Sequence, residues 1–191
     1  MKVSREQAER NRDRIIEVAS RLFRERGFDG VGVADLMKAA GLTHGGFYGH
    51  FESKDDLAAE ACARSLAHSA AKWEDIAAAA KDDAFAALVR TYLSGRHRES
   101  PGASCALAAL GTDTARHGRA VKRAYARGLE ALVAILARAA PGRGSSAAKR
   151  RKALAAMAEM AGAVMLARAV GDAGLAREIV AAVEDDLTGK A

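Results

Sequence analysis

Apolar residues recur every three or four positions along most of the chain, which is the spacing of one face of an α-helix. The first such face consists of Ile15, Ile16, Ala19, Leu22 and Phe23. Gly27 follows the two arginines that end this segment, an arrangement typical of a helix carboxyl terminus. The same reasoning predicts helices over residues 9–26, 33–40, 54–80, 83–98, 103–116, 119–139, 147–170 and 173–188.

Runs of β-branched residues are absent, and alanine, leucine, arginine and glutamate are abundant in a chain of 191 residues with only two prolines. These residues are good helix formers, so the chain is predicted to be all-α. The breaks between the later helices contain glycine or proline, as in PGRGSS at residues 141–146 and GDAG at residues 171–174.

The segment LTHGGFYGHF departs from the helical pattern around it because it contains three glycines. Glycine in a helix interior costs about 0.5 to 1 kcal/mol relative to alanine, and such departures tend to cluster at functional sites. We expect a short α-helix here that buries Phe47 and Phe51 at positions i and i+4. At about 100° per residue, Gly45 and Gly49 then point away from the buried face.

The short helix over residues 33–40 and the helix that follows it have the arrangement of a helix-turn-helix, whose second helix enters the major groove of DNA. Thr43 is the expected N-cap of that second helix, and His44 is the residue best placed to reach a base edge. The candidate DNA-binding residues are Thr43, His44, Gly45, Gly46, Tyr48, His50 and Lys54. Four arginines of the preceding segment are expected to touch the DNA backbone or a minor groove, namely Arg5, Arg10, Arg12 and Arg14.

The run GFDGVGVADLMKAAGLTHGGFYGHFESKDDL, residues 27–57, resembles the DNA-binding domain of TetR/AcrR-type bacterial transcriptional repressors. The similarity rests on the alanine-glycine turn, on a tyrosine followed two residues later by His-Phe, and on the lysine and leucine that follow. The resemblance implies a three-helix helix-turn-helix domain, here residues 1–54, and an antiparallel helical bundle over residues 55–191. It also implies a homodimer that binds a palindromic operator and is released by a small-molecule effector bound in the bundle.

The chain departs from this family at two places. Family members usually carry threonine or serine where this chain has Val31 and Gly32, and there the hydroxyl caps the second helix and often meets a phosphate. A bulkier residue is also common at the position of Gly49, which removes one groove contact. We therefore expect operator specificity to rest largely on the polar residues Thr43, His44 and Tyr48.

Aromatic and methionine residues are concentrated in the otherwise alanine-rich bundle, where they suit a cavity for an apolar or aromatic effector. The candidate effector-binding residues are Trp73, Phe85, Tyr92, Cys105, Tyr125, Met157, Met160 and Met165, and ordinary core packing explains each one individually. Cys105 has a second interpretation as a redox or electrophile sensor, with its thiolate favoured by a helix start and by Arg96 and Arg98. The alternative is a small buried hydrophobic side chain.

Small residues in the last two helices permit close helix contact, and a two-fold, four-helix interface between two copies is their expected use. They are Ala153, Ala155, Ala156, Ala161, Gly162 and Ala163, and internal packing explains them equally well. The basic run at residues 149–152 favours a solvated turn over a second DNA site.

The net charge of +6 does not locate a nucleic-acid site, because basic and acidic residues are equal in number within residues 1–57. Neither a signal peptide nor the roughly 18 uninterrupted apolar residues of a bilayer span is recognisable, so a cytoplasmic protein without membrane contact is expected. The histidines and cysteines lack metal-ligand spacing, and the sequence contains neither catalytic triads nor glycine-rich phosphate loops. We therefore expect no metal, no cofactor and no enzymatic activity.

These features favour a dimeric, ligand-responsive transcriptional regulator, most simply a repressor. The alternative is a helical small-molecule-binding or adaptor protein that has kept the fold and lost operator recognition.

Overall fold

The computed structural model describes residues 4–94, 102 and 105–189, and all regular structure within these residues is helical, as predicted. The elements in chain order are α1 (Arg5–Arg26), α2 (Val33–Ala39), η1 (His44–Gly49), α3 (Lys54–Ala80), η2 (Lys81–Asp83), α4 (Ala84–Leu93), α6 (Ala106–Arg116), α7 (Arg119–Ala139), α8 (Ser146–Ala169) and α9 (Ala173–Thr188). No helix among the described residues is long and apolar enough to cross a bilayer.

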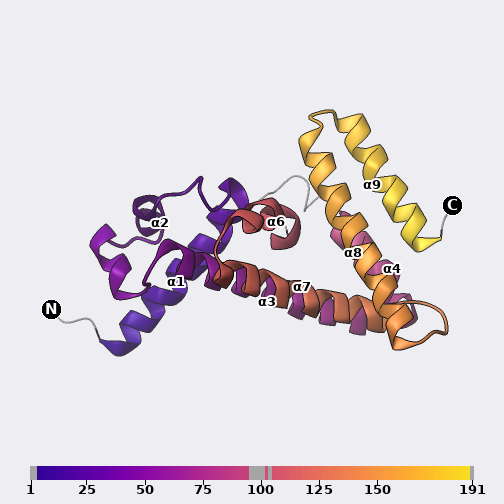
Figure 1. The fold of residues 1–191 in the computed structure, drawn as a ribbon, viewed down its shortest axis with the longest axis horizontal. Helices are drawn as coiled ribbons and strands as arrows, with labels where there is room; N and C mark the ends of the chain where they lie inside the picture. The colour runs from indigo at the N-terminus through magenta and orange to yellow at the C-terminus, as the bar shows by residue number, and fades with distance from the viewer. Residues whose placement is uncertain (1–3, 95–101, 103–104, 190–191) are drawn as a thin grey trace.

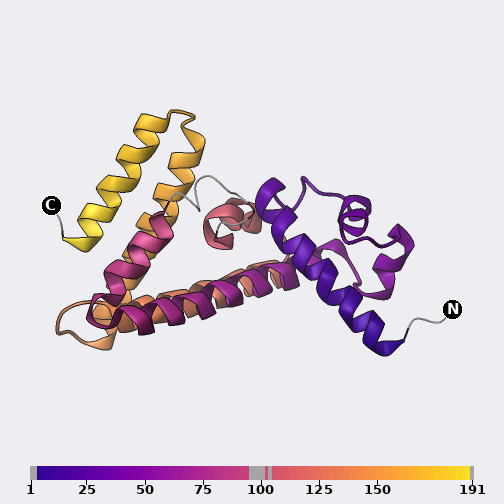
Figure 2. The same cartoon turned by 180° about the vertical axis from the view of Figure 1, so that it is seen from behind.

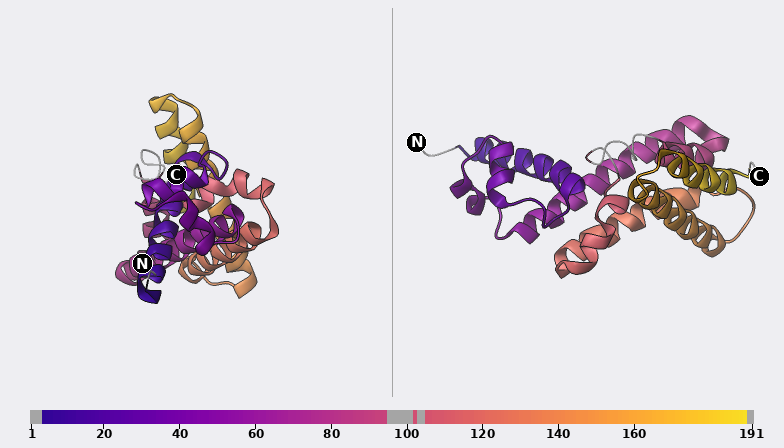
Figure 3. Two further views of the ribbon diagram at one scale, coloured as in Figure 1. Left: turned by 90° about the vertical axis from the view of Figure 1, so that its left-hand side faces the viewer. Right: turned by 90° about the horizontal axis from the view of Figure 1, so that it is seen from above.

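The molecule is elongated, with a small amino-terminal group at one end and a helical bundle at the other (Figure 1). α1, α2 and η1 form the amino-terminal group, while α3 and α7 run side by side from this group to the far end. Seen from behind, α1 crosses the start of α3 (Figure 2). Seen from above, α8 and α9 lie at the end opposite the amino-terminal group, and α6 lies between the two parts (Figure 3).

α1 begins four residues earlier than the apolar pattern predicts. Ser4 is its N-cap, because the Ser4 hydroxyl accepts a hydrogen bond from the Gln7 N–H at 3.1 Å. Polar pairs one turn apart extend the helix where no apolar residue marks it. The predicted carboxyl end is confirmed, since Gly27 follows α1 with a positive φ of 75°.

The remaining helices agree with the predicted ranges to within a few residues wherever the structure describes them. α4 ends at Leu93 rather than residue 98, and residues 95–98 and 103–104 of the predicted ranges lie outside the described part of the chain. Ser53 caps α3 as its position suggests, because its hydroxyl accepts a hydrogen bond from the Asp56 N–H at 3.1 Å.

The amino-terminal group and the bundle share the first half of α3. The Ser20 hydroxyl of α1 donates to the Ala61 carbonyl of α3 at 3.1 Å, and Phe23 packs edge-on against Phe28 in the core beside it. The predicted boundary between residues 54 and 55 falls in the first turn of α3, and the division into two domains stays a prediction.

Gly128 allows α7 to lie close against α3. A Cβ atom at Gly128 would stand 2.3 Å from Leu66 Cδ1, a separation that real Cβ atoms do not show. The two helices run in the same direction, since Gly118 lies beside Asp55 at their starts and Arg138 pairs with Glu74 near their ends. The α3–α7 pair is therefore the long structural link between the two ends of the molecule.

Candidate nucleic-acid interface

The segment with three glycines forms a 3₁₀-helix, η1, so the predicted α-helix is wrong in type. The His50 N–H donates to the Phe47 carbonyl at 2.9 Å, which is a bond between residues three apart. Glycine weakens a regular α-helix, and six residues are too few to stabilise one by length. Thr43 stands at the N-cap as predicted, although its side chain makes no capping hydrogen bond.

The predicted buried and outward sides of this segment are both observed. Phe47 and Phe51 are buried, and their ring centroids lie 5.6 Å apart. Added Cβ atoms at Gly45 and Gly49 would meet nothing within 4 Å, so both glycines face open space. Gly46 differs, because its Cβ would lie 3.6 Å from Met37 Cε and its N–H donates to the Thr43 carbonyl.

Tyr48 is the most prominent side chain on this surface. It is 69% exposed and stands edge-on against Phe47, with ring centroids 5.2 Å apart. Thr43 and His44 are also exposed, and His50 is half-buried. The exposed tyrosine and histidine beside two bare glycines offer hydrogen-bond donors around a backbone that a duplex can approach closely.

Lys54 is held at the first position of α3 by two hydrogen bonds around the helix start. Besides the Ser53 bond, the Asp56 carboxylate accepts a hydrogen bond from the Glu52 N–H at 3.4 Å. This arrangement fixes the entry of the chain into α3 and sets Lys54, which is half-buried, next to the loop from η1.

The arginines of α1 differ in their partners and in their exposure. Arg12 pairs with both carboxylate oxygens of Glu60, one of them at 2.7 Å, and its guanidinium lies 4.7 Å from the Phe51 ring centroid. The hydrogen bond with Glu60 raises the pKa of Arg12. Arg12 therefore joins α1 to α3, whereas Arg14 is exposed, and the DNA contacts expected of both stay predictions.

Val31 and Gly32 provide no capping hydroxyl at the start of α2, as their departure from the family pattern suggests. Val31 is buried in the core, and Gly32 is the N-cap of α2 without a side-chain hydrogen bond. The hydroxyl that family members place here is therefore replaced by apolar packing.

The end of α6 contacts the amino-terminal group through residues that the sequence pattern does not single out. The Asp113 carboxylate accepts the Phe28 N–H at 3.2 Å. The His117 ring packs against Phe28 at 4.7 Å, with Nδ1 3.1 Å from Asp55 and Nε2 3.7 Å from Asp29. These partners lie 62 to 89 positions away in sequence, so no local pattern marks them.

Several predicted effector-binding residues meet where α6 begins. Trp73 of α3 and Tyr92 of α4 stack edge-on at 5.8 Å, and Tyr92 lies beside Cys105. The Tyr125 hydroxyl of α7 donates to the Leu107 carbonyl at 2.9 Å, and burial raises the pKa of Tyr125 to about 12. This group thus joins four elements at the amino-terminal end of α6.

The other candidates lie outside this group. Met157 and Met160 are buried, and Phe85 is buried near the Lys152 ammonium, which lies 5.5 Å from its ring centroid. Met165 is 45% exposed, so its expected place in a cavity is wrong.

Cys105 is buried, and burial raises the pKa of its thiol. A raised pKa disfavours the thiolate that a redox or electrophile sensor needs. Arg96 and Arg98, the cations expected to favour the thiolate, lie outside the described residues. The structure therefore favours the interpretation of Cys105 as a small buried hydrophobic side chain.

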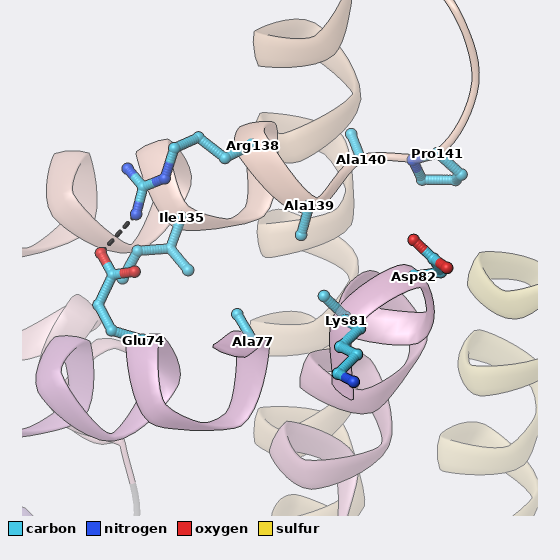
Figure 4. Close-up of a pocket in the computed structure, with 10 residues that line it drawn as sticks. Glu74, Ala77, Lys81, Asp82, Ile135, Arg138, Ala139, Ala140 and Pro141 are labelled. Carbon is cyan, nitrogen blue, oxygen red and sulfur yellow. Dashed lines mark hydrogen bonds and ion pairs between the residues drawn. The ribbon is translucent and has the colours of Figure 1, made fainter. Parts of the chain in front are cut away.

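A pocket of about 360 Å³ opens at the far end of the bundle, where α3 and α7 both end (Figure 4). Its lining includes the Glu74–Arg138 ion pair, Lys81 and Asp82. None of the predicted effector-binding residues lines this pocket. Among the described residues, no cluster of histidine, cysteine or carboxylate side chains is suited to a metal ion.

The outward side of α8 and the start of α9 expose large apolar side chains. Leu154, Met165, Leu166 and Leu175 are between 40% and 49% exposed. Of the small residues expected at a dimer interface, Ala153, Ala156 and Ala163 are buried inside the protomer instead. A Cβ at Gly162 would meet nothing within 4 Å, so that glycine faces outward.

Comparison with known proteins gives a consistent result. Residues 15–61 match the family described as bacterial regulatory proteins, tetR family. Over 57 residues the chain is 39% identical to the HTH-type transcriptional regulator AcrR of Shigella flexneri, covering 30% of this chain and 26% of AcrR. It is 32% identical over 108 residues to the HTH-type transcriptional repressor KstR2 of Rhodococcus jostii, covering 56% of this chain and 50% of KstR2. The chain thus spans half or less of these relatives.

The similarity to solved structures extends over the whole fold. The reduced form of NemR from E. coli superposes with a TM-score of 0.80 at 19% identity, covering 94% of this chain and 95% of NemR. A TetR-family regulator from Cytophaga hutchinsonii gives a TM-score of 0.78 at 20% identity, covering 99% of this chain and 98% of the regulator. The bundle thus has the same fold as these structures, although its sequence is only distantly similar.

Proposed function

Because this chain belongs to the TetR/AcrR family of bacterial regulatory proteins, we propose that it is a transcriptional regulator that binds a palindromic operator as a homodimer and responds to a small-molecule effector. The same membership makes it a regulator rather than an enzyme. The observation that carries the proposal is the surface of η1, where Tyr48 is exposed beside two glycines that face open space.

The side chains of this surface divide into two roles. Tyr48, His50 and Lys54 donate to phosphates and set the position of the protein on the duplex. Thr43, the N-cap of η1, likewise donates to a phosphate, and His44, the first residue of η1, reaches base edges in the major groove. Gly45 and Gly49 allow the backbone to approach, whereas Gly46 packs on α2 and holds the turn.

The apolar side of α8 and α9 is the surface that a second copy covers. Large apolar side chains that gather on one face of a protomer mark an interaction surface, and a two-fold axis lets the same face meet itself. Pairing of two protomers would bury Leu166 and Met165 and would place two η1 surfaces at a fixed separation.

Effector binding is coupled to DNA through α6. Tyr92 and Cys105 meet at the start of this helix, and Asp113 and His117 hold its end against the amino-terminal group. An apolar or aromatic effector that separates α6 from Tyr92 shifts the helix and its contacts with Phe28. The fraction of dimers whose two η1 surfaces are at the separation needed for operator binding then falls.

A gel shift with the DNA that flanks the gene of this protein tests the proposal. We expect a dimer to bind one palindromic site at moderate salt, with half-sites one or more helical turns apart. A folded, dimeric protein that binds no palindrome there or among randomised duplexes is instead the adaptor that has lost operator recognition.

A further inference from the structure

Four basic side chains lie on one exposed side of the first half of α7. They are Arg119, Lys122, Arg123 and Arg127, and we call them the α7 basic stripe. The opposite side of the same turns buries Val121 and Ala124. Within the part of the chain that the structure describes, none of the four pairs with a carboxylate, while Glu130, the first acid along α7, pairs with Arg150.

This arrangement is unfavourable for the isolated helix. Cations in the first turn of a helix oppose the macrodipole, and like charges one turn apart repel. The first turn of α7 contains no acidic residue, and its N-cap, Gly118, has no side chain to offset the charge. Arginines elsewhere, such as Arg64 and Arg138, have carboxylate partners. A set of cations left without such partners fits an anion that comes from outside the chain.

The stripe begins beside the candidate nucleic-acid interface. His117 Nδ1 lies 3.1 Å from Asp55, and a Cβ at Gly118 would lie 3.1 Å from the same carboxylate. Asp55 directly follows Lys54, and Arg119 directly follows Gly118. Two carboxylates at this point, Asp29 and Asp55, both face His117. Lys54 and Arg119 are therefore the next residues along the chain from this contact between α3 and the start of α7. The contact lies at the end of α7 nearest the amino-terminal group (Figure 1).

We propose that the α7 basic stripe binds the phosphate backbone of double-stranded DNA that flanks each half-site of the operator. This inference rests on the proposed function and extends the same interface from η1 and Lys54 onto the bundle. The positive charge of the stripe fits an anionic partner, and its continuity with Lys54 favours duplex DNA over an acidic protein as the occupant. Such contacts carry no sequence preference and contribute to affinity through release of counterions.

The test compares two duplexes that contain the same operator, one ending at the half-sites and one extended by about one helical turn on each side. Binding of the full-length dimer is measured by fluorescence anisotropy from about 50 to 200 mM salt. The variant is R119A/K122A/R123A. The matched control is R143A/K149A/R151A, which removes the same charges around the start of α8, at the end of the bundle away from the amino-terminal group.

For the wild type we expect a steeper salt dependence on the long duplex than on the short one, because each added phosphate contact increases the slope by about 0.9. The stripe variant should show no such difference. If each protomer of the variant neutralises one phosphate fewer, the ratio of wild-type to variant affinity on the long duplex should fall about tenfold between roughly 50 and 200 mM salt. The stripe variant should bind the short duplex as the wild type does. The control variant should bind both duplexes as the wild type does.

Equal behaviour of the stripe variant and the control on the long duplex would overturn the proposal while leaving operator binding intact. Binding of an acidic protein by the stripe, with no change in DNA affinity, would overturn it in the same way. If the folded wild-type dimer binds neither duplex, the proposed function fails, and the stripe proposal fails with it. Circular dichroism of each variant establishes that the helices remain formed.

Discussion

Lys81, between α3 and α4, adopts a backbone conformation that side chains rarely take. Its φ is 50°, and it is the only non-glycine residue with positive φ among the described residues. A Cβ atom in this region clashes with the neighbouring backbone, whereas glycine does not. The chain therefore stores local strain where α3 turns into α4, at the edge of the charged pocket.

Replacement of Lys81 by glycine is expected to raise the free energy of unfolding by roughly 0.5 to 1 kcal/mol, because the steric penalty exceeds the added entropy of the unfolded chain. Urea denaturation of the purified protein measures this change. Lys81→Ala is the control, since alanine keeps the Cβ and should give no gain. If both variants gain the same free energy of unfolding, the effect comes from loss of the lysine charge and not from relief of backbone strain.

Among the helices, those that the sequence predicts well have an apolar face and a local end signal. Ser53 and Gly27 mark ends of this kind, and both lie where the pattern places them. The predicted α-helix after Thr43 is a 3₁₀-helix because its three glycines weaken an α-helix and six residues are too few to stabilise one. The contacts of His117 join residues distant in sequence, and no single-sequence pattern encodes them.

Gly128 is expected to control the close packing of α3 and α7. Gly128→Ala places a Cβ against Leu66 and should lower the free energy of unfolding by about 1 to 3 kcal/mol through overpacking. Denaturant titration measures this, with Leu66→Ala and the double variant completing a double-mutant cycle. Because Leu66→Ala removes two of the three clashing atoms, Cδ1 and Cγ, and keeps only the Cβ, the double variant should be more stable than the sum of the single effects predicts. Strict additivity would show that the glycine has no role in this contact.

The whole molecule is expected to work as two copies joined through α8 and α9. Leu166→Glu places a charge in the apolar face of α8 and should convert the dimer to a monomer. A monomer carries one η1 surface and engages one half-site, so operator binding should weaken by at least about tenfold. Sedimentation analysis and anisotropy measure the two effects.

Ala134→Glu is the control for the dimer, because it adds the same charge at an exposed position of α7. It should leave both the dimer and the operator affinity unchanged. A Leu166→Glu protein that remains dimeric at micromolar concentration would place the interface elsewhere.

In the assembled dimer, we expect some residues of η1 to contact bases of the operator, and other residues of η1 together with Lys54 to contact its phosphates. The decisive experiment measures operator affinity as a function of salt for the wild type and for His44→Ala, Tyr48→Ala and Lys54→Ala, each on the operator and on duplexes with one altered base pair. The Tyr48 and Lys54 variants should weaken binding to all duplexes and lower the salt slope, Lys54→Ala by about 0.9 per phosphate contact. His44→Ala should keep the wild-type slope and lose about 1 to 3 kcal/mol of discrimination at one position. Identical slopes and identical sequence preference in all four proteins would refute this division of roles.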